Sequence, residues 1–167
     1  LLTHFRMVAD ATDLPVILYD IPGRTGVPIK YETILRLAKH PNILAVKDAK
    51  GDFSEVSRVL NQTDLMYFSG DDANVLPHLS IGATGLIGVT ANIAAAPYRV
   101  IVDAVNAGDL HAARAAHQGL GPLVRREDVG QDRQRGGHDE RAADAHQGTG
   151  ADEHVGVVGH RRERRAE

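Results

Sequence analysis

The sequence has no cysteine and no tryptophan, and aromatic residues make up only 4% of its 167 residues. Without cysteine, neither a disulfide nor a thiolate metal site is possible. No apolar run approaches the ~20 residues of a membrane-spanning helix, and no signal peptide is recognisable. The net charge of −3 gives no reason to expect nucleic acid as a partner. These absences favour a cytoplasmic protein that binds neither a membrane nor nucleic acid.

The apolar residues are distributed unevenly along the chain. Residues 1–123 hold every Ile, Leu, Phe, Tyr, Met and Lys, whereas residues 124–167 hold nine Arg, ten Asp or Glu, four His and seven Gly. The second segment can bury almost no apolar area, so we expect a charged, disordered tail. Its residues are mostly those of GC-rich codons, so a shifted reading frame after about Arg125 is an alternative origin for it. Because the chain begins without Met, we expect a piece of something longer.

Four short apolar runs in residues 1–123 lack the alternation of a half-exposed strand. They predict buried parallel strands at Pro15–Asp20, Asn42–Asp48, Leu65–Gly70 and Thr84–Thr90. Stretches with helical spacing lie between them, and together these elements predict an α/β fold with a parallel sheet. The strand starts are roughly 20–27 residues apart, which is typical of a TIM barrel. Residues 1–123 are therefore expected to form about four βα units, the C-terminal half of a (β/α)8 barrel, followed by the tail.

Several chemically useful side chains stand at the carboxyl ends of these runs, where a TIM barrel carries its active site. Tyr19 ends the first run and Arg24 follows in the next turn, while Lys47 ends the second run. A lysine walled by apolar side chains has a lowered pKa, so its neutral amine can form a Schiff base. A tyrosine can move the protons, and an arginine can bind a carboxylate. The residues alone leave open whether Lys47 is a nucleophile or only marks the strand's exit into solvent.

Four segments resemble consecutive motifs of one family: VILYDIPGRTGV, ILAVKDAKGD, FSGDD and GLIGVTANI. From Leu1 to about Val124 the chain is similar to the dihydrodipicolinate synthases, also called 4-hydroxy-tetrahydrodipicolinate synthases. The resemblance implies a class I aldolase-type lyase of lysine and diaminopimelate biosynthesis, on a TIM barrel, with pyruvate and aspartate semialdehyde as substrates. It implies that no metal and no organic cofactor are needed, and that the full family chain forms a homo-oligomer, a tetramer.

The resemblance also assigns residues to roles. Lys47 matches the lysine that forms the Schiff base with pyruvate, and Tyr19 matches the tyrosine that relays protons. Arg24 matches the arginine that binds the carboxylate of the semialdehyde. Ile87 matches a residue whose backbone carbonyl borders the pyruvate site, and Gly70 matches a glycine in the wall of the same pocket.

Two alternatives stay open. N-acetylneuraminate lyase and related aldolases share the strand-end tyrosine and lysine, although the GRTG loop here is the synthase version. The second alternative is a non-catalytic half-barrel, because the family's pyruvate-contacting threonines and second relay tyrosine belong to the other half. A half-barrel would leave open sheet edges at Pro15–Asp20 and Thr84–Thr90, which favour association.

The other polar residues have plainer expected roles. Lys50 is expected to be a solvated loop lysine. Asp71 and Asp72 are expected to serve the start of a helix as N-cap and dipole partners, without a metal. His78 and His111 are expected to be ordinary surface or packing residues.

Overall fold

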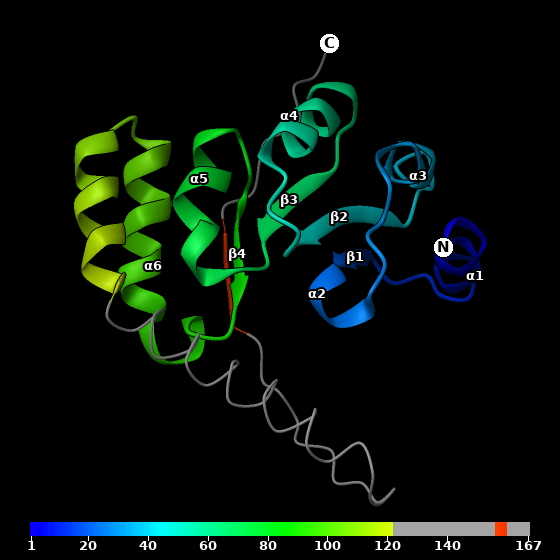
Figure 1. The fold of residues 1–167 in the computed structure, drawn as a ribbon, viewed down its shortest axis with the longest axis horizontal. Coiled ribbons are helices and arrows are strands. Elements are labelled where there is room, and N and C mark those ends of the chain that lie inside the picture. The colour runs from blue at the N-terminus through cyan, green and yellow to red at the C-terminus, as the bar shows by residue number, and fades with distance from the viewer. Residues whose placement is uncertain (122–155, 160–167) are drawn as a thin grey trace, which may run out of the picture.

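The structure is a computed structural model that describes residues 1–121 and 156–159. Strands and helices alternate along most of the chain, as Figure 1 shows. The strands are β1 (Val16–Asp20), β2 (Ile43–Asp48), β3 (Met66–Ser69), β4 (Gly85–Gly88) and β5 (Gly156–Gly159). The helices are α1 (Leu2–Asp10), α2 (Pro22–Thr25), α3 (Tyr31–Leu37), α4 (Phe53–Gln62), the 3-10 turn η1 (Asp72–Asn74), α5 (Val75–Ser80) and α6 (Ala91–Asn106). A last helix is described over residues 110–121.

The five strands form one sheet in the order β1-β2-β3-β4-β5. The first four are parallel, and β2, β3 and β4 each pair with the strand that precedes them in sequence. The four apolar runs thus form the four predicted strands, and the α/β fold with a parallel sheet is confirmed. The register places Tyr19 beside Lys47 and Lys47 beside Phe68, so the carboxyl ends of β1 to β3 lie together.

Strand β5 was not expected from the sequence. It lies within the segment predicted to be disordered, and it pairs antiparallel with β4, with Ile87 opposite Val157. The prediction of a structureless tail is therefore wrong for residues 156–159, and the expected open edge at Thr84–Thr90 is covered, because β5 supplies the partner that β4 would lack. The other tail residues, 124–155 and 160–167, lie outside the described residues.

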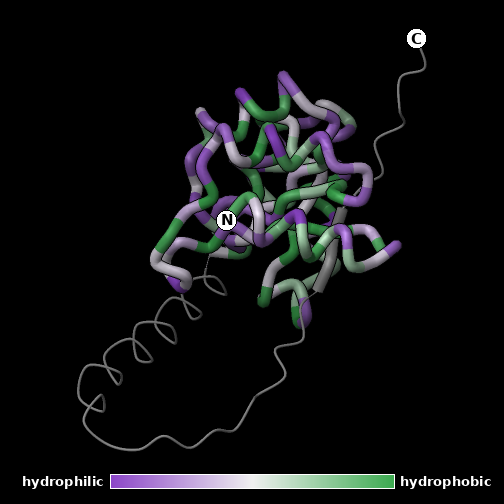
Figure 2. Tube along the Cα trace, turned by 90° about the vertical axis from the view of Figure 1, so that its right-hand side faces the viewer, coloured by the Kyte–Doolittle hydropathy of each residue, from purple (hydrophilic) through white to green (hydrophobic). Residues whose placement is uncertain are grey.

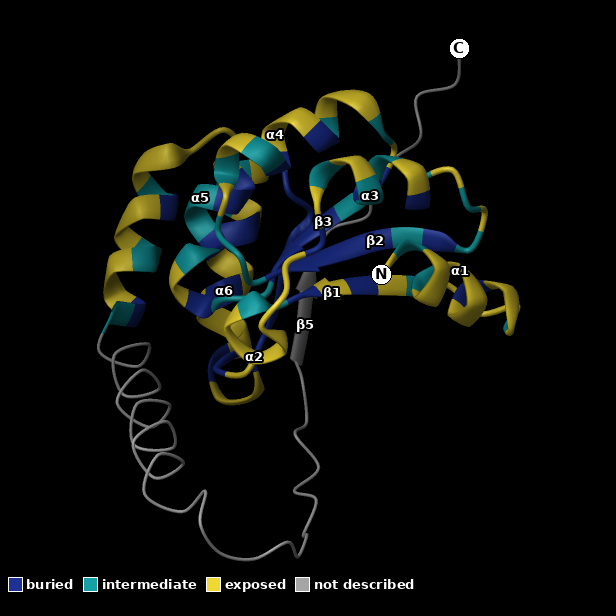
Figure 3. Cartoon of the chain, turned by 45° about the vertical axis from the view of Figure 1, so that its right-hand side comes forward, coloured by how far each residue is buried: buried dark blue, intermediate teal, exposed yellow. Residues whose placement is uncertain are grey.

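The helices cover one face of the curved sheet, where most of the core lies (Figure 1). One buried cluster joins β1 and β2 to α1, α3 and α4, and a second joins β4 to α5, α6 and the last helix. Figure 2 shows hydrophilic segments along many outer turns of the trace. In Figure 3 the strands are mostly dark blue, and the outward sides of the helices are yellow. None of the described helices has the length and apolar character of a membrane span.

Strand β1 differs from the other strands in its exposure. Leu18 and Asp20 point into the helix-covered side and are buried, whereas Ile17 and Tyr19 are on the opposite face and are exposed. On that opposite face, β2 to β4 contribute a small buried cluster of Ala45, Phe68 and Ile87. In a closed barrel this face is the filled interior, so the described sheet shows one face packed and the other only partly covered.

Candidate active site at the carboxyl ends of the strands

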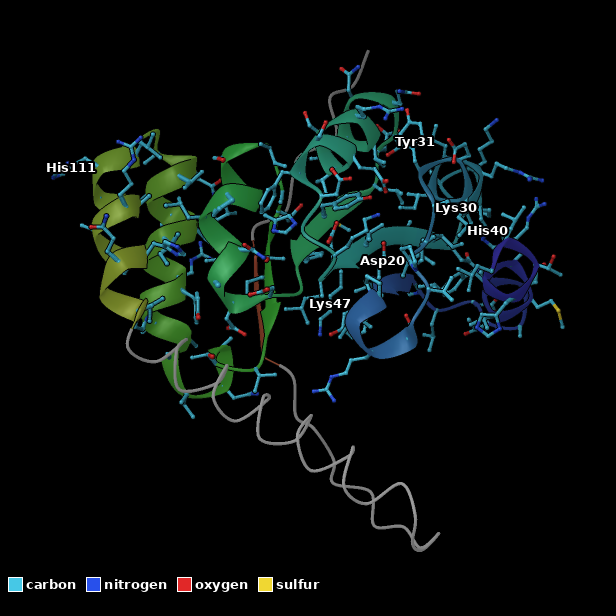
Figure 4. The ribbon with its side chains drawn as sticks, viewed as in Figure 1. Asp20, Lys30, Tyr31, His40, Lys47 and His111 are labelled. Carbon is cyan, nitrogen blue, oxygen red and sulfur yellow. The ribbon has the colours of Figure 1, made fainter. Side chains whose placement is uncertain are left out.

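Lys47 and Tyr19 face each other at the ends of neighbouring strands. The Lys47 Nζ atom lies 3.9 Å from the centroid of the Tyr19 ring, within cation–π distance. Lys47 is 9% exposed, and Tyr19 is 40% exposed. Figure 4 shows Lys47 at the end of β2, beside α2. The amine is therefore nearly enclosed, next to a phenol that solvent can reach.

The wall around Lys47 is made of apolar side chains and a glycine. Phe68 is its register partner on β3, and Ala45 precedes it by two residues on the same face of β2. At Gly70, an added Cβ would lie 3.0 Å from Lys47 Cγ and 3.0 Å from the Asp48 carbonyl carbon and oxygen. A side chain at position 70 would therefore press on the stem of the lysine. The structure brings Gly70, Lys47 and Tyr19 together.

The two remaining predicted site residues lie further from this centre. Arg24 is an exposed residue of the short helix α2, which begins at Pro22 and ends at Gly26 in the left-handed conformation (φ 71°). Ile87 lies on β4 and packs in the small cluster with Ala45 and Phe68. All five predicted residues thus follow or occupy the sheet, and Arg24 lies in the turn after β1.

The expectation that Lys50 is a solvated loop residue is wrong. Its side chain is 15% exposed, and its Nζ atom lies 3.2 Å from Asp20 Oδ2 and 2.5 Å from Glu55 Oε1. Burial by itself would lower the pKa of Lys50, but the hydrogen bond to Glu55 and the charge of Asp20 outweigh it and raise this pKa above its ordinary value. The physical reason for the ion pair is that the Asp20 carboxylate, only 1% exposed, needs a nearby cation.

Two carboxylates at strand ends accept hydrogen bonds from the backbone of the segments that follow β1 and β2. This role was not predicted from the sequence. Asp48 Oδ1 accepts hydrogen bonds from the backbone N–H groups of Lys50 at 2.7 Å and Gly51 at 3.0 Å. Asp20 Oδ1 accepts from the Ile29 N–H at 3.0 Å, which ties down the chain after α2. The available signal was the acid that directly follows each reactive residue, in the pairs Tyr19-Asp20 and Lys47-Asp48.

The acids after β3 divide into two roles. Asp71 caps η1 by accepting a hydrogen bond from the Ala73 N–H at 2.8 Å, as predicted. Asp72 starts the same turn, but it is buried and accepts from the Val89 N–H at 3.1 Å, against the backbone of Gly88. Asp72 is thus a structural link between η1 and the end of β4, which corrects the expectation of a simple helix-start carboxylate.

The predicted packing role is confirmed for His78, which is fully buried. Its Nδ1–H donates to the Asn74 carbonyl at 3.0 Å, its ring meets Phe53 edge to face, and burial lowers its pKa. His111 is exposed. Within the part of the chain that the structure describes, no group of three or more His, Cys, Asp or Glu side chains is arranged to hold a metal ion.

A parallel sheet of βα units, with a buried lysine and a tyrosine at adjacent strand ends, defines an α/β protein built from the units of a TIM barrel. Residues 1–128 match the Dihydrodipicolinate synthetase family, and the chain belongs to that family.

Curated relatives carry the same family name. The chain is 57% identical over 122 residues to the 4-hydroxy-tetrahydrodipicolinate synthase of Kineococcus radiotolerans, covering 73% of this chain and 40% of that protein. It is 55% identical over 123 residues to the synthase of Acidothermus cellulolyticus, covering 74% of this chain and 40% of that protein. The chain thus spans about 40% of the length of the curated relatives that it matches.

Solved structures support the same fold. The synthase of Cyanidioschyzon merolae, solved with lysine bound, superimposes with a TM-score of 0.72 at 36% identity, over 74% of this chain and 43% of that one. The synthase of Methylacidiphilum fumariolicum superimposes with a TM-score of 0.71 at 38% identity, over 74% of this chain and 42% of that one.

Proposed function

We propose that residues 1–123 are the nucleophile-bearing half of a 4-hydroxy-tetrahydrodipicolinate synthase barrel, a lyase of lysine and diaminopimelate biosynthesis. The single observation that carries the proposal is the Lys47 amine, nearly enclosed at the end of β2 and 3.9 Å from the centroid of the Tyr19 ring. Burial removes the water that stabilises an ammonium ion, so the neutral amine that attacks a carbonyl is easier to form than in solvent.

The proposed reaction begins when the neutral Lys47 amine attacks the keto carbon of pyruvate. Loss of water gives an imine, and loss of a methyl proton gives the enamine. The enamine carbon then attacks the aldehyde of aspartate semialdehyde, and cyclisation through the substrate amine releases Lys47. The protonated imine is itself the electron sink, so the proposed chemistry needs neither a metal nor an organic cofactor.

The other predicted residues have distinct proposed roles. Tyr19 moves protons to and from the carbinolamine, since its ring lies beside the amine. Arg24, exposed on α2, binds the carboxylate of the semialdehyde by paired hydrogen bonds. Gly70 leaves room for the lysine stem, and Ile87 lines the pyruvate side of the pocket.

We further propose that the 167 residues alone form imine without completing the synthase reaction. The described parallel strands supply one group of site residues, whereas a (β/α)8 barrel draws its active site from eight strand ends. We propose that residues 1–123 form the barrel part, that the charged segment 124–167 is a tail that adds only β5 to the sheet among the described residues, and that the complete barrel works as a homo-oligomer. The competing candidate is a non-catalytic half-barrel, which the exposed Ile17 and Tyr19 on β1 favour.

Trapping with borohydride tests the proposal. The chain is incubated with pyruvate and sodium borohydride, digested, and analysed by peptide mass spectrometry. A reduced pyruvate adduct is expected at Lys47 and not at Lys50, whose amine is held by two carboxylates. Lys47→Arg is the matched variant: its guanidinium stays protonated, so the adduct should disappear. Labelling at Lys50 alone, or none at Lys47, would contradict the assignment.

A further inference from the structure

A group of carboxylates lies on the face of the sheet opposite to the Tyr19 and Lys47 side chains. Asp20 follows Tyr19 and Asp48 follows Lys47, and successive strand side chains point to opposite faces of a sheet. Tyr19 and Lys47 therefore face the open side, while both carboxylates face the helix-covered side and are buried. Glu55, from the first turn of α4, approaches the same place.

Lys50 is the cation that contacts two of these carboxylates, Asp20 and Glu55. Its Nζ atom contacts Asp20 Oδ2 at 3.2 Å and Glu55 Oε1 at 2.5 Å, and it donates to the Ile29 carbonyl at 3.4 Å. These contacts join β1, the segment after α2 and α4 to the loop after β2. Figure 4 shows Asp20 between the ends of β1 and β2, close to Lys47.

We propose that Lys50 is a positioning residue for the Schiff-base site, which partly neutralises Asp20 and Glu55 on the opposite face of the sheet, so that these two carboxylates add less negative charge near Lys47 beside that of Asp48. This inference rests on the proposed function and deepens it. Without Lys50, a buried carboxylate one strand away would favour the ammonium form of Lys47, and less neutral amine would be available for pyruvate.

Other charges around the site do not replace this cation. The titratable groups on the surrounding elements are Tyr19 and Asp20 of β1, Arg24 of α2, Asp48 of β2, Glu55 of α4, Tyr67 of β3, Asp71 and Asp72 at η1, and His78 of α5. Most of them are acids, Arg24 is exposed, and burial lowers the pKa of His78, which keeps that ring neutral. The buried acids act through the interior: burial, followed by the charges of Asp48, Glu55 and Asp20, strongly raises the pKa of Tyr67.

The test measures the titration of Lys47 in the 167-residue chain. Trace acetic anhydride acetylates neutral amines, and peptide mass spectrometry across a pH series gives the midpoint at Lys47 without any need for pyruvate. The variants are Lys50→Met, Lys50→Arg, Asp20→Asn and the double variant Lys50→Met with Asp20→Asn. Lys39→Met, at an exposed lysine after α3, is the control. Circular dichroism checks that each variant is folded.

Charge compensation predicts a definite order of midpoints. Lys50→Met should raise the Lys47 midpoint by about one pH unit, the order of magnitude of the effect of one nearby charge inside a protein. Asp20→Asn should lower it, the double variant should return it close to wild type, and Lys50→Arg and Lys39→Met should leave it unchanged. The rate of borohydride trapping near neutral pH should fall about tenfold in Lys50→Met.

A midpoint that is the same in Lys50→Met and wild type would overturn the inference. If Lys50→Met does not fold, the double variant and Asp20→Asn decide, because equal midpoints in these two would also overturn it. Failure of trapping at Lys47, with the order of midpoints retained, would reject the proposed function and leave the role of Lys50 standing. Trapping without that order would reject the role of Lys50 alone.

Discussion

The two halves of the parallel sheet carry different kinds of residue at the carboxyl ends of their strands. Strands β1 and β2 end in Tyr19-Asp20 and Lys47-Asp48, with reactive side chains on one face and carboxylates on the other. Strand β3 ends before Gly70 and β4 ends at Gly88, where an added Cβ would meet neighbouring atoms at 3.0 Å and 2.5 Å. The first half places polar side chains on both faces of the sheet, whereas the second half has glycines that leave room for the Lys47 stem at Gly70 and for the Asp72 carboxylate at Gly88.

The largest expected effect is at the end of β4. Gly88→Ala would place a Cβ 2.5 Å from Asp72 Oδ1 and 2.8 Å from Asp72 Oδ2. The buried carboxylate must then move and lose its hydrogen bond from the Val89 N–H. We expect the free energy of unfolding to fall by about 3–5 kcal/mol, the sum of overpacking and a lost charged hydrogen bond, as measured by urea denaturation.

Gly119→Ala is the control for that measurement. Gly119 lies in the last helix, and an added Cβ there meets no atom within 4 Å. Alanine is the better helix former, so this variant should gain about 0.5–1 kcal/mol. Equal effects of the two substitutions would show that close approach at β4 does not matter.

The next effect concerns recognition in the first half of the sheet. In a complete barrel that contains residues 1–121, Arg24→Ala should raise the KM for aspartate semialdehyde roughly 10- to 150-fold, because a charged hydrogen bond of about 1.5–3 kcal/mol is lost. The KM for pyruvate should change little. Arg36→Ala, at an exposed arginine of α3, is the matched control. An equal rise for both substrates would refute carboxylate recognition by Arg24.

A smaller effect is expected where the two halves meet. Gly70→Ala would bring a Cβ to 3.0 Å from Lys47 Cγ and from the backbone of Asp48. We expect a loss of about 1–2 kcal/mol in unfolding free energy and slower borohydride trapping at Lys47, because the lysine stem must shift. Trapping at the wild-type rate would mean that the glycine has no part in placing the amine.

The smallest expected effect is a change in pH dependence. Burial lowers the pKa of His78 in the folded state, so the unfolded chain binds this proton more readily. The stability from neutral His78 is therefore complete above about pH 6.5 and is lost as the pH falls from there towards the folded-state pKa, by about 1.4 kcal/mol per unit of difference. His78→Asn, whose amide can still donate to the Asn74 carbonyl, should flatten this slope.

Chemical denaturation between pH 5 and 7.5 measures that slope. His111→Asn is the control, because His111 is exposed on the last helix and should leave the slope unchanged. Burial also lowers the pKa of His117, so part of the slope should remain in His78→Asn. A variant slope as steep as that of wild type would contradict the assignment to His78.

The sequence was most informative where the determining pattern is local. Continuous apolar runs located the four parallel strands, although β4 is confined to Gly85–Gly88 within the predicted Thr84–Thr90. The cap at Asp52, which accepts from the Glu55 N–H at 2.9 Å, was likewise predictable from residues three apart. The positions of Lys47 and Tyr19 at adjacent strand ends were predictable in the same way, because each residue stands near the end of an apolar run.

The features that sequence reasoning missed depend on partners far along the chain. Lys50 pairs with Asp20, thirty residues earlier, and Asp72 accepts from the Val89 N–H, seventeen residues later. Neither pairing has a local signature, since each exists only after parallel strands have come together. Strand β5 was missed for a similar reason: Gly156–Gly159 is a short apolar stretch among charges, and it becomes a strand only through pairing with β4.

The strand β5 also changes how copies of this chain can associate. A sheet that is open on both sides can add a strand at either side, and repeated addition has no natural end. In the described residues, β5 occupies the outer side of β4, so β1 and β5 are the two strands with a single neighbour. Pairing of β1 with β1 of a second copy would use one edge of each molecule and leave the β5 edges at the outside of the joint sheet. The antiparallel strand thus moves one edge of the sheet from β4 to β5 and makes the two edges different, one belonging to a parallel pair and the other to an antiparallel pair.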